Sequence, residues 1–349
     1  MCLCNNKKIK INIKDFLFRF DNTMYDLITP NQPVYVFFYN FWNGFMEKTD
    51  SMNYTFFITL LEKVYKCPVH MTRNPDEANV LIDSIFGGQT YLYYKKWNAS
   101  FLFTGESNYY NVSRVDHYDC VLGFDNTHDR YVKCPLYLLF LHSNSSIYEQ
   151  LLENDKQISS KNFTVPVQST GIPPNKASVV ITNNSHGTER LRFMDRLEEH
   201  MTLFYGGKYK NNIGGVVDGH FNSPEMNEFY QRGKFAITME NADQPYYVTE
   251  KLVNGLRSGV VPVYWGTSRV SEFFNPKRFL HLKPGATEED ISEMIERMKS
   301  MTDEEYLSMI REPIMTKSID DIMSEIAESI KKRLTLLTFN VVYVSSSSD

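Results

Sequence analysis

The segment FAITMENADQPYYVTEKLVNGLRSGVVPVYWG (235–266) decides the fold of the second half of the chain. It contains, in order, a short apolar run, a polar loop, a helical stretch and a second apolar run. Thr249 stands where the helix would have its N-cap, and Gly259 stands just past its expected end. This order predicts a strand, a helix and a parallel strand, which is the repeating unit of an α/β sheet.

The same alternation continues on both sides of this segment. Apolar runs typical of buried strands occupy 33–42, 78–86, 99–106, 118–125, 177–183 and 202–207. Helical patterns occupy 55–67, 188–201, 224–234, 287–301, 303–311 and 318–334. The last of these helices is expected to cross back onto the first domain. The apolar stretch 334–344 is too short to cross a bilayer, and we predict a strand or a packed segment there.

A polar, turn-rich stretch between about 143 and 176 predicts a boundary between two domains. The organisation that follows has four parts. They are a first Rossmann-like domain (1–160), a linker (161–176), a second Rossmann-like domain (177–315), and a C-terminal helix with its tail (316–349).

Composition excludes several classes of protein. The 349 residues are 42% apolar and 23% charged, which is ordinary for globular domains. The net charge of −5 argues against a general nucleic-acid binder, and no run of residues is long and apolar enough for a membrane span. The five cysteines are odd in number and form no CxxC pair, which favours free thiols in a reducing compartment. The charged N-terminus does not read as a signal peptide, so the predicted location is cytoplasmic.

The helix beginning at Glu250 carries the first candidate site. Ligands of doubly wound sheets bind at the carboxyl ends of the strands. Exposed N–H groups at a helix start favour an anion, and Lys251 would add a full positive charge beside a diphosphate. Glu250 could accept hydrogen bonds from sugar or ribose hydroxyls. The alternative is that Glu250 is an acid favoured at a helix start and Lys251 a solvated surface lysine.

This segment closely resembles the donor-binding signature of the α1,3/α1,4-fucosyltransferase family, most of all its soluble bacterial branch. The family reads F-x-x-x-x-E-N, then Y-V-T-E-K, then a Gly followed by x-P-V-x-x-G. The matching residues are Phe235, Glu240, Asn241, Tyr247, Val248, Thr249, Glu250, Lys251, Gly259, Pro262, Val263 and Gly266. The resemblance implies a GT-B fold, in which two Rossmann-like domains face each other across a cleft. The acceptor domain would come first and the GDP-fucose domain second.

Two further segments resemble the same family. TNNSHGTERLRFMDRL (182–197) places Arg190 on the family's arginine, which can fork onto phosphate oxygens. Arg192 is a rival for that role, and an ordinary exposed arginine is the alternative. The stretch 103–138 resembles the acceptor-domain segment and places Glu106 on the carboxylate that the family uses as general base. The alternative is that Glu106 caps the turn that follows.

The resemblance implies an inverting transfer of L-fucose from GDP-fucose to a glycan hydroxyl, with the 3-hydroxyl of GlcNAc or glucose as the expected position. Glu106 would remove the acceptor proton, and Arg190 and Lys251 would stabilise the departing diphosphate. The residues expected to position the ribose and fucose are Asn241, Tyr247 and Glu250.

No bound cofactor is expected beyond the GDP-fucose substrate. Because no D-x-D triplet or His/Asp cluster occurs, we expect that a metal is not essential. Two alternatives stay open at this point: a transferase of the same fold with another nucleotide sugar, and a non-catalytic glycan-binding protein. The oligomeric state stays open as well.

Overall fold

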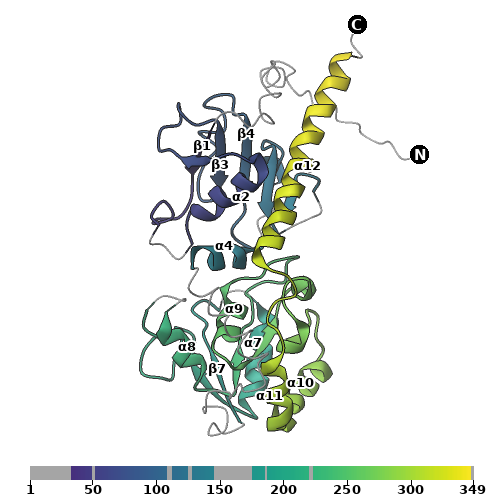
Figure 1. Ribbon diagram of the computed structural model, residues 1–349. Helices are drawn as coiled ribbons and strands as arrows, with labels where there is room; N and C mark the ends of the chain where they lie inside the picture. Colours follow the sequence, from purple (N-terminus) through teal and green to yellow (C-terminus); the bar gives the residue numbers. More distant parts are fainter. Residues whose placement is uncertain are drawn as a thin grey trace, which may run out of the picture.

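The computed structural model describes residues 33–48, 52–107, 112–124, 128–144, 175–184, 187–219 and 223–346. Two α/β domains are stacked end to end, and the long helix α12 (Ile319–Ser346) runs from the second domain along the side of the first (Figure 1). The predicted α/β class is therefore confirmed. Most of the predicted linker lies in 145–174, outside the described residues.

The first domain is built on a six-stranded sheet in which every pairing is parallel. Its strands are β1 (Val34–Tyr39), β2 (Val69–Met71), β3 (Val80–Ser84), β4 (Ala99–Phe103), β5 (Cys120–Gly123) and β6 (Tyr131–Lys133). They lie in the order β2-β1-β3-β4-β5-β6. Every residue of β3, β4 and β5 is buried, which explains why these strands read as continuous apolar runs.

Among the described residues of this domain, the helices are α2 (Thr55–Tyr65), α3 (Val112–Val115) and α4 (Leu136–Ser143), and α12 adds to them from the end of the chain. Helix α2 buries one face through Phe56, Phe57, Leu60, Leu61 and Val64, at the spacing of an amphipathic helix. Helix α4 lies between the two domains (Figure 1), and its residues 136–141 are all buried.

The second domain contains a five-stranded parallel sheet in the order β11-β10-β9-β7-β8. Its strands are β7 (Lys176–Val179), β8 (Thr202–Tyr205), β9 (Phe235–Ile237), β10 (Val261–Trp265) and β11 (Leu280–Leu282). Its helices are α7 (Thr188–Glu198), α8 (Pro224–Tyr230), α9 (Glu250–Arg257), α10 (Glu288–Ser300) and α11 (Asp303–Arg311). Thr249 is the N-cap of α9, as predicted, and Gly259 follows its end with a φ of 71°.

Helix α12 packs against α2, β5 and β6 of the first domain, which confirms that it crosses back. Its residues Ile322, Met323, Ile326 and Ile330 are buried in a hydrophobic cluster that contains residues of both domains. The prediction of a strand or packed segment at 334–344 is wrong as to a strand, because α12 continues to Ser346. Extending an existing helix is easier than starting a new element, and no Gly or Pro interrupts this stretch.

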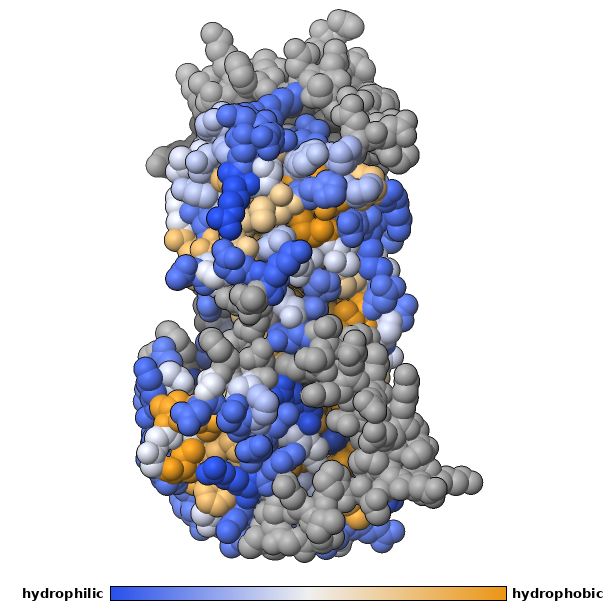
Figure 2. Space-filling view, turned by 60° about the vertical axis from the view of Figure 1, so that its left-hand side comes forward, coloured by the Kyte–Doolittle hydropathy of each residue, from blue (hydrophilic) through white to orange (hydrophobic). Residues whose placement is uncertain are grey.

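The outer surface of both domains is mainly hydrophilic on the face shown in Figure 2, with apolar side chains in separate patches. Among the helices of the described residues, none is at once long enough and apolar enough to cross a bilayer.

Candidate active site

The start of helix α9 is bound to a buried carboxylate. Glu240 follows strand β9 and is fully buried, and its backbone N–H donates to the Trp265 carbonyl at 2.8 Å. The Glu240 carboxylate accepts the Thr249 N–H and the Thr249 hydroxyl, both at 2.8 Å. Burial raises the pKa of Glu240, and Lys251 and the two Thr249 bonds offset part of that rise. The N-cap of α9 is thus fixed by a residue at the carboxyl end of the neighbouring strand.

Lys251 lies between two carboxylates. Its Nζ is 3.3 Å from Glu240 Oε2, 3.4 Å from Glu250 Oε1 and 3.0 Å from Thr249 Oγ1. Burial alone lowers the pKa of Lys251, but Glu250 and Glu240 raise it above its ordinary value. Lys251 is therefore a cation, and its three N–H donors already have acceptors in the protein. It is not the solvated surface lysine of the alternative interpretation.

Gly266 shows why the second half of the signature needs a glycine. Its φ of 154° is one that side chains rarely adopt. A Cβ at this position would lie 2.5 Å from the Tyr264 hydroxyl and 2.9 Å from Cγ of Glu240. A side chain at this position would have to displace Tyr264 or Glu240, the residue that binds the N-cap of α9.

Glu106 lies in the loop after β4, in the first domain. The strand ends at Phe103, so Glu106 does not close the strand as predicted but follows it by three residues. Gly105 is needed for close approach, because a Cβ there would lie 2.6 Å from the Phe103 ring. The Glu106 N–H donates to the Thr104 carbonyl at 2.6 Å, while its side chain is exposed.

Glu106 is electrostatically coupled to the second domain. Partial burial raises the pKa of its carboxyl, Lys251 lowers it in part, and Glu250 raises it further, which leaves the pKa above its ordinary value. Glu106 therefore lies within electrostatic range of the start of α9, although it belongs to the other domain. A carboxylate with a raised pKa that remains exposed is suited to accept a proton.

Arg190 lies in the first turn of α7 and is almost fully buried. Its guanidinium donates to the Asn183 carbonyl at 2.6 Å, whereas its Nε has no hydrogen-bond partner among the described residues. Burial lowers its pKa, and Glu240 and Tyr247 act in the opposite direction. A buried donor without an acceptor is rare in folded proteins and suggests that a ligand supplies the acceptor.

Gly187 leaves room for the buried side chain of Arg190. Its φ is 80°, and a Cβ there would lie 2.9 Å from Arg190 Nε and 3.2 Å from the Asn241 carbonyl oxygen. Arg190 and Asn241 therefore meet at the same glycine. The Asn241 side-chain oxygen, like Arg190 Nε, has no hydrogen-bond partner in the described part of the chain.

Arg192, the rival of Arg190, has other partners. It donates to the Ala286 carbonyl, and its Nε is 3.4 Å from Glu288. Its side chain is 42% exposed. Arg192 thus links α7 to α10 and does not join Glu240 and Lys251.

Tyr247 completes the group of predicted residues. It is buried, and its ring lies edge-on to Phe124 of the first domain at a centroid distance of 5.1 Å. Burial raises the pKa of its hydroxyl, with Lys251 acting against this and Glu240 adding to it. Electrostatic interactions also reach it from Glu106. Tyr247 therefore lies where the two domains meet.

The structure brings the predicted residues together around Glu240, which the sequence reasoning did not include as a site residue. The sequence does contain a signal for Glu240, because it is an acid at the carboxyl end of a buried strand and lies inside the matched signature. The group contains three carboxylates and two cations, so it carries an excess of negative charge. Binding of a diphosphate to this group therefore requires backbone N–H donors and the exchange of existing ion pairs.

Within the part of the chain that the structure describes, no three or more His, Cys, Asp and Glu side chains are grouped so that they could hold a metal ion. The expectation that a metal is not essential stays a prediction.

Comparison with known proteins identifies relatives of the chain. Residues 174–311 match the family model described as glycosyltransferase family 10 (fucosyltransferase), C-terminal. The alpha-(1,3)-fucosyltransferase of Helicobacter pylori is 26% identical over 262 residues, which cover 69% of this chain and 52% of that protein. A 4-galactosyl-N-acetylglucosaminide 3-alpha-L-fucosyltransferase of Homo sapiens is 29% identical over 135 residues, covering 38% of this chain and 35% of the human protein. The chain thus spans about half, or less, of the length of these curated relatives.

Solved structures show the fold. A crystal structure of an alpha1,3-fucosyltransferase with GDP covers 88% of this chain and 93% of its own, with a TM-score of 0.62 and 21% identity. The same kind of enzyme with GDP-fucose gives a TM-score of 0.59 at 21% identity, covering 89% of this chain and 95% of its own. The predicted GT-B architecture of two Rossmann-like domains is confirmed by this likeness.

Proposed function

Because residues 174–311 match the family model described as glycosyltransferase family 10 (fucosyltransferase), we propose that this protein transfers L-fucose from GDP-fucose to a hydroxyl of a glycan. One observation carries the proposal further than the family match. A carboxylate of the first domain, Glu106, is coupled to the cation at the start of α9 in the second domain. A base and a diphosphate-binding cation on opposite domains suit a reaction between an acceptor and a nucleotide sugar.

The proposed reaction is a single displacement with inversion. Glu106 removes the proton of the acceptor hydroxyl as its oxygen attacks C1 of fucose. The bond between C1 and the diphosphate oxygen breaks on the opposite face, and GDP leaves. A β-linked donor therefore gives an α-fucoside. We propose the 3-hydroxyl of GlcNAc or glucose as the acceptor position, on the strength of the α1,3-linkage named for the relatives.

Charge on the departing diphosphate requires cations. Arg190 is suited to this role because its buried Nε lacks an acceptor among the described residues. Lys251 can reach a phosphate only by giving up one of its present acceptors. Glu250, whose side chain is 22% exposed, is easier to release than the fully buried Glu240. We therefore propose that diphosphate binding exchanges the contact between Lys251 and Glu250.

Release of Glu250 would free its carboxylate for the donor. We propose that Glu250, Asn241 and Tyr247 position the ribose and fucose, as the resemblance implies. The unpaired Asn241 oxygen supports this, since it could accept a hydroxyl hydrogen. No bound cofactor is part of the proposal. The cytoplasmic location also stays a prediction; Cys67, Cys120 and Cys134 are free thiols, as a reducing compartment would keep them.

GDP and GDP-fucose should raise the melting temperature of the protein, because a ligand that binds only the folded state stabilises it by mass action. UDP and CMP should raise it much less at equal concentration. Thermal shift measurements over a series of nucleotides and nucleotide sugars test this. Equal protection by UDP-sugars would contradict the donor assignment and favour a transferase that uses another nucleotide sugar. GDP protection without transfer or GDP release would favour a glycan-binding protein.

A further inference from the structure

Three consecutive residues of the second domain are each contacted by a different residue of the first. In this loop, 246–248, the ring of Tyr246 lies under the Lys133 ammonium, with 4.7 Å between Nζ and the ring centroid. The ring of Tyr247 lies edge-on to that of Phe124, with 5.1 Å between the ring centroids. The Val248 carbonyl accepts a hydrogen bond from the Tyr137 N–H at 2.9 Å. The first domain therefore holds loop 246–248 along its whole length.

The loop needs such support because Tyr246 has left-handed backbone geometry. Its φ is 63°, which is unfavourable for a bulky side chain. Backbone strain of this kind persists only where surrounding contacts over-determine it. Tyr246 is buried, and its N–H donates to Thr267 Oγ1 at 3.3 Å. The contact of its ring with Lys133 adds a restraint from the opposite domain.

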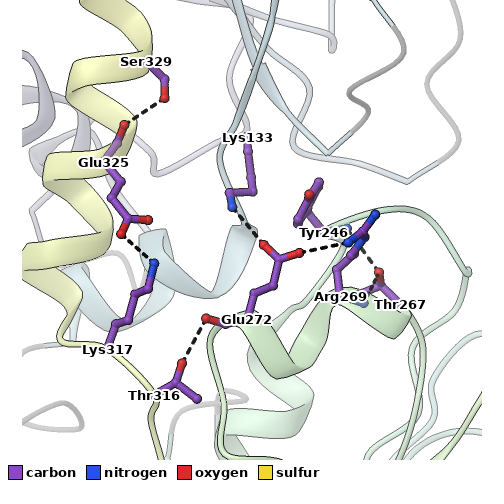
Figure 3. A network of polar contacts seen from close by, with 9 residues as sticks. All are labelled: Lys133, Tyr246, Thr267, Arg269, Glu272, Thr316, Lys317, Glu325 and Ser329. Atoms are coloured by element: carbon purple, nitrogen blue, oxygen red, sulfur yellow. Dashed lines mark hydrogen bonds and ion pairs between the residues drawn. The ribbon is translucent and has the colours of Figure 1, made fainter.

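Lys133 is the last residue of the edge strand β6, and its ammonium faces the second domain (Figure 3). Its Nζ is 3.1 Å from Glu272 Oε2 and 5.1 Å from the centroid of the Phe273 ring. Glu272 also accepts from Arg269 at 3.5 Å. The side chains of Lys133 and Glu272 are only 31% and 35% exposed, so this ion pair is partly shielded from water.

The loop leads directly into the candidate site. Val248 is followed by Thr249, the N-cap that Glu240 binds, and then by Glu250 and Lys251. A change in loop 246–248 would therefore move the start of α9. It would also change the position of that helix relative to Glu106 on the first domain.

We propose that Lys133 is a positioning residue for the transfer reaction. Its cation fixes Tyr246 from the first domain and thereby holds the donor-binding start of α9 opposite Glu106. This inference rests on the proposed function, because it assigns a role within that same site. In this role Lys133 acts through Tyr246 and not directly on the substrate.

Lys133→Met tests the role, since it keeps an unbranched side chain and removes the charge. We expect kcat/KM for the donor to fall about tenfold, the scale of a partly desolvated cation–π contact. The melting temperature should change little. Lys133→Arg should restore most of the activity, because a guanidinium also stacks on aromatic rings and pairs with a carboxylate. Wild-type kinetics in a folded Lys133→Met protein would overturn the proposal.

Arg269→Met is the matched control. Arg269 pairs with the same Glu272, its loss changes the charge equally, and its side chain is 59% exposed. Activity should stay near that of the wild type. An equal loss in both variants would mean that charge on Glu272, and not the contact with Tyr246, is responsible, and the proposal would be wrong.

Hydrogen–deuterium exchange separates this inference from the proposed function. In protein without added nucleotide, the amides of 246–251 should exchange faster in Lys133→Met than in wild type or Arg269→Met. This result requires no transfer activity. If wild-type protein neither binds GDP nor transfers fucose, the proposed function fails, while the exchange data still decide whether Lys133 holds the loop. Unchanged exchange in Lys133→Met would overturn the positioning role, even in an active enzyme.

Discussion

Replacing Glu106 with glutamine should lower the transfer rate by ~10²–10⁴-fold, the usual contribution of a positioned general base. Glutamine keeps the shape of the side chain, so GDP-fucose binding should persist. The transfer rate should fall because Glu106 alone, among the site carboxylates, has both an exposed side chain and a raised pKa at the domain boundary. Steady-state kinetics with calorimetric GDP-fucose binding check both halves of this expectation.

The pH dependence of Glu106 gives a second measurement. Its pKa lies above the ordinary value, so the wild-type rate should fall as pH decreases through that raised pKa, where the carboxylate becomes protonated. The acidic limb should be absent from the residual activity of Glu106→Gln. A raised carboxyl pKa also means that ionisation disfavours the folded state at neutral pH. Glu106→Gln should therefore not lower the melting temperature. If Glu106 instead only caps the turn that follows it, the variant should be less stable than the wild type and keep its activity.

Replacing Arg190 with alanine should remove roughly 2–4 kcal/mol of transition-state stabilisation, the scale of one preorganised charge contact. GDP affinity should fall as well, because the same guanidinium would contact the diphosphate before and during bond breaking. The basis is its buried Nε, which lacks a hydrogen-bond acceptor among the described residues. Values of kcat/KM and of the Kd for GDP, measured on the same preparation, give both effects.

Arg192→Ala is the control for this prediction. Arg192 lies on the same helix but binds Ala286 and Glu288, so its loss should leave transfer nearly unchanged. Loss of transfer in Arg192→Ala, together with normal transfer in Arg190→Ala, would assign the diphosphate contact to Arg192. Lys251→Ala should also lower transfer by a similar factor. It is a less clean test, because it leaves buried Glu240 without its cation and should destabilise the fold too.

The sequence was most informative where local chemistry and periodicity agree. Helix α9 could be placed within a residue or two, because Thr249 and Gly259 carry its two end signals. The buried strands of both sheets were found because parallel sheets produce continuous apolar runs. Strands β2, β6 and β11 contain three residues each and, unlike the equally short β9, are not part of a longer apolar run, so no pattern marks them.

The structure supplies contacts among the predicted site residues that the sequence does not encode. Glu250 and Lys251 stand out as charges at a helix start. The ion pairs of Lys251 with Glu250 and with Glu240 depend on a loop whose path follows from left-handed Tyr246 and from Gly266. The contacts of Lys133 and Phe124 with this loop join different domains, and no short-range pattern encodes them. The catalytic and binding roles themselves stay predictions.

The path of helix α12 sets the order in which this protein can be completed during synthesis. Multidomain chains generally fold from the N-terminus as they leave the ribosome. Here the first domain lacks Ile322, Ile326 and Ile330 until the second domain has already been translated. Its core therefore stays open at one side while residues 175–311 emerge and fold. We therefore expect the first domain to close only after helix α12 has been synthesised.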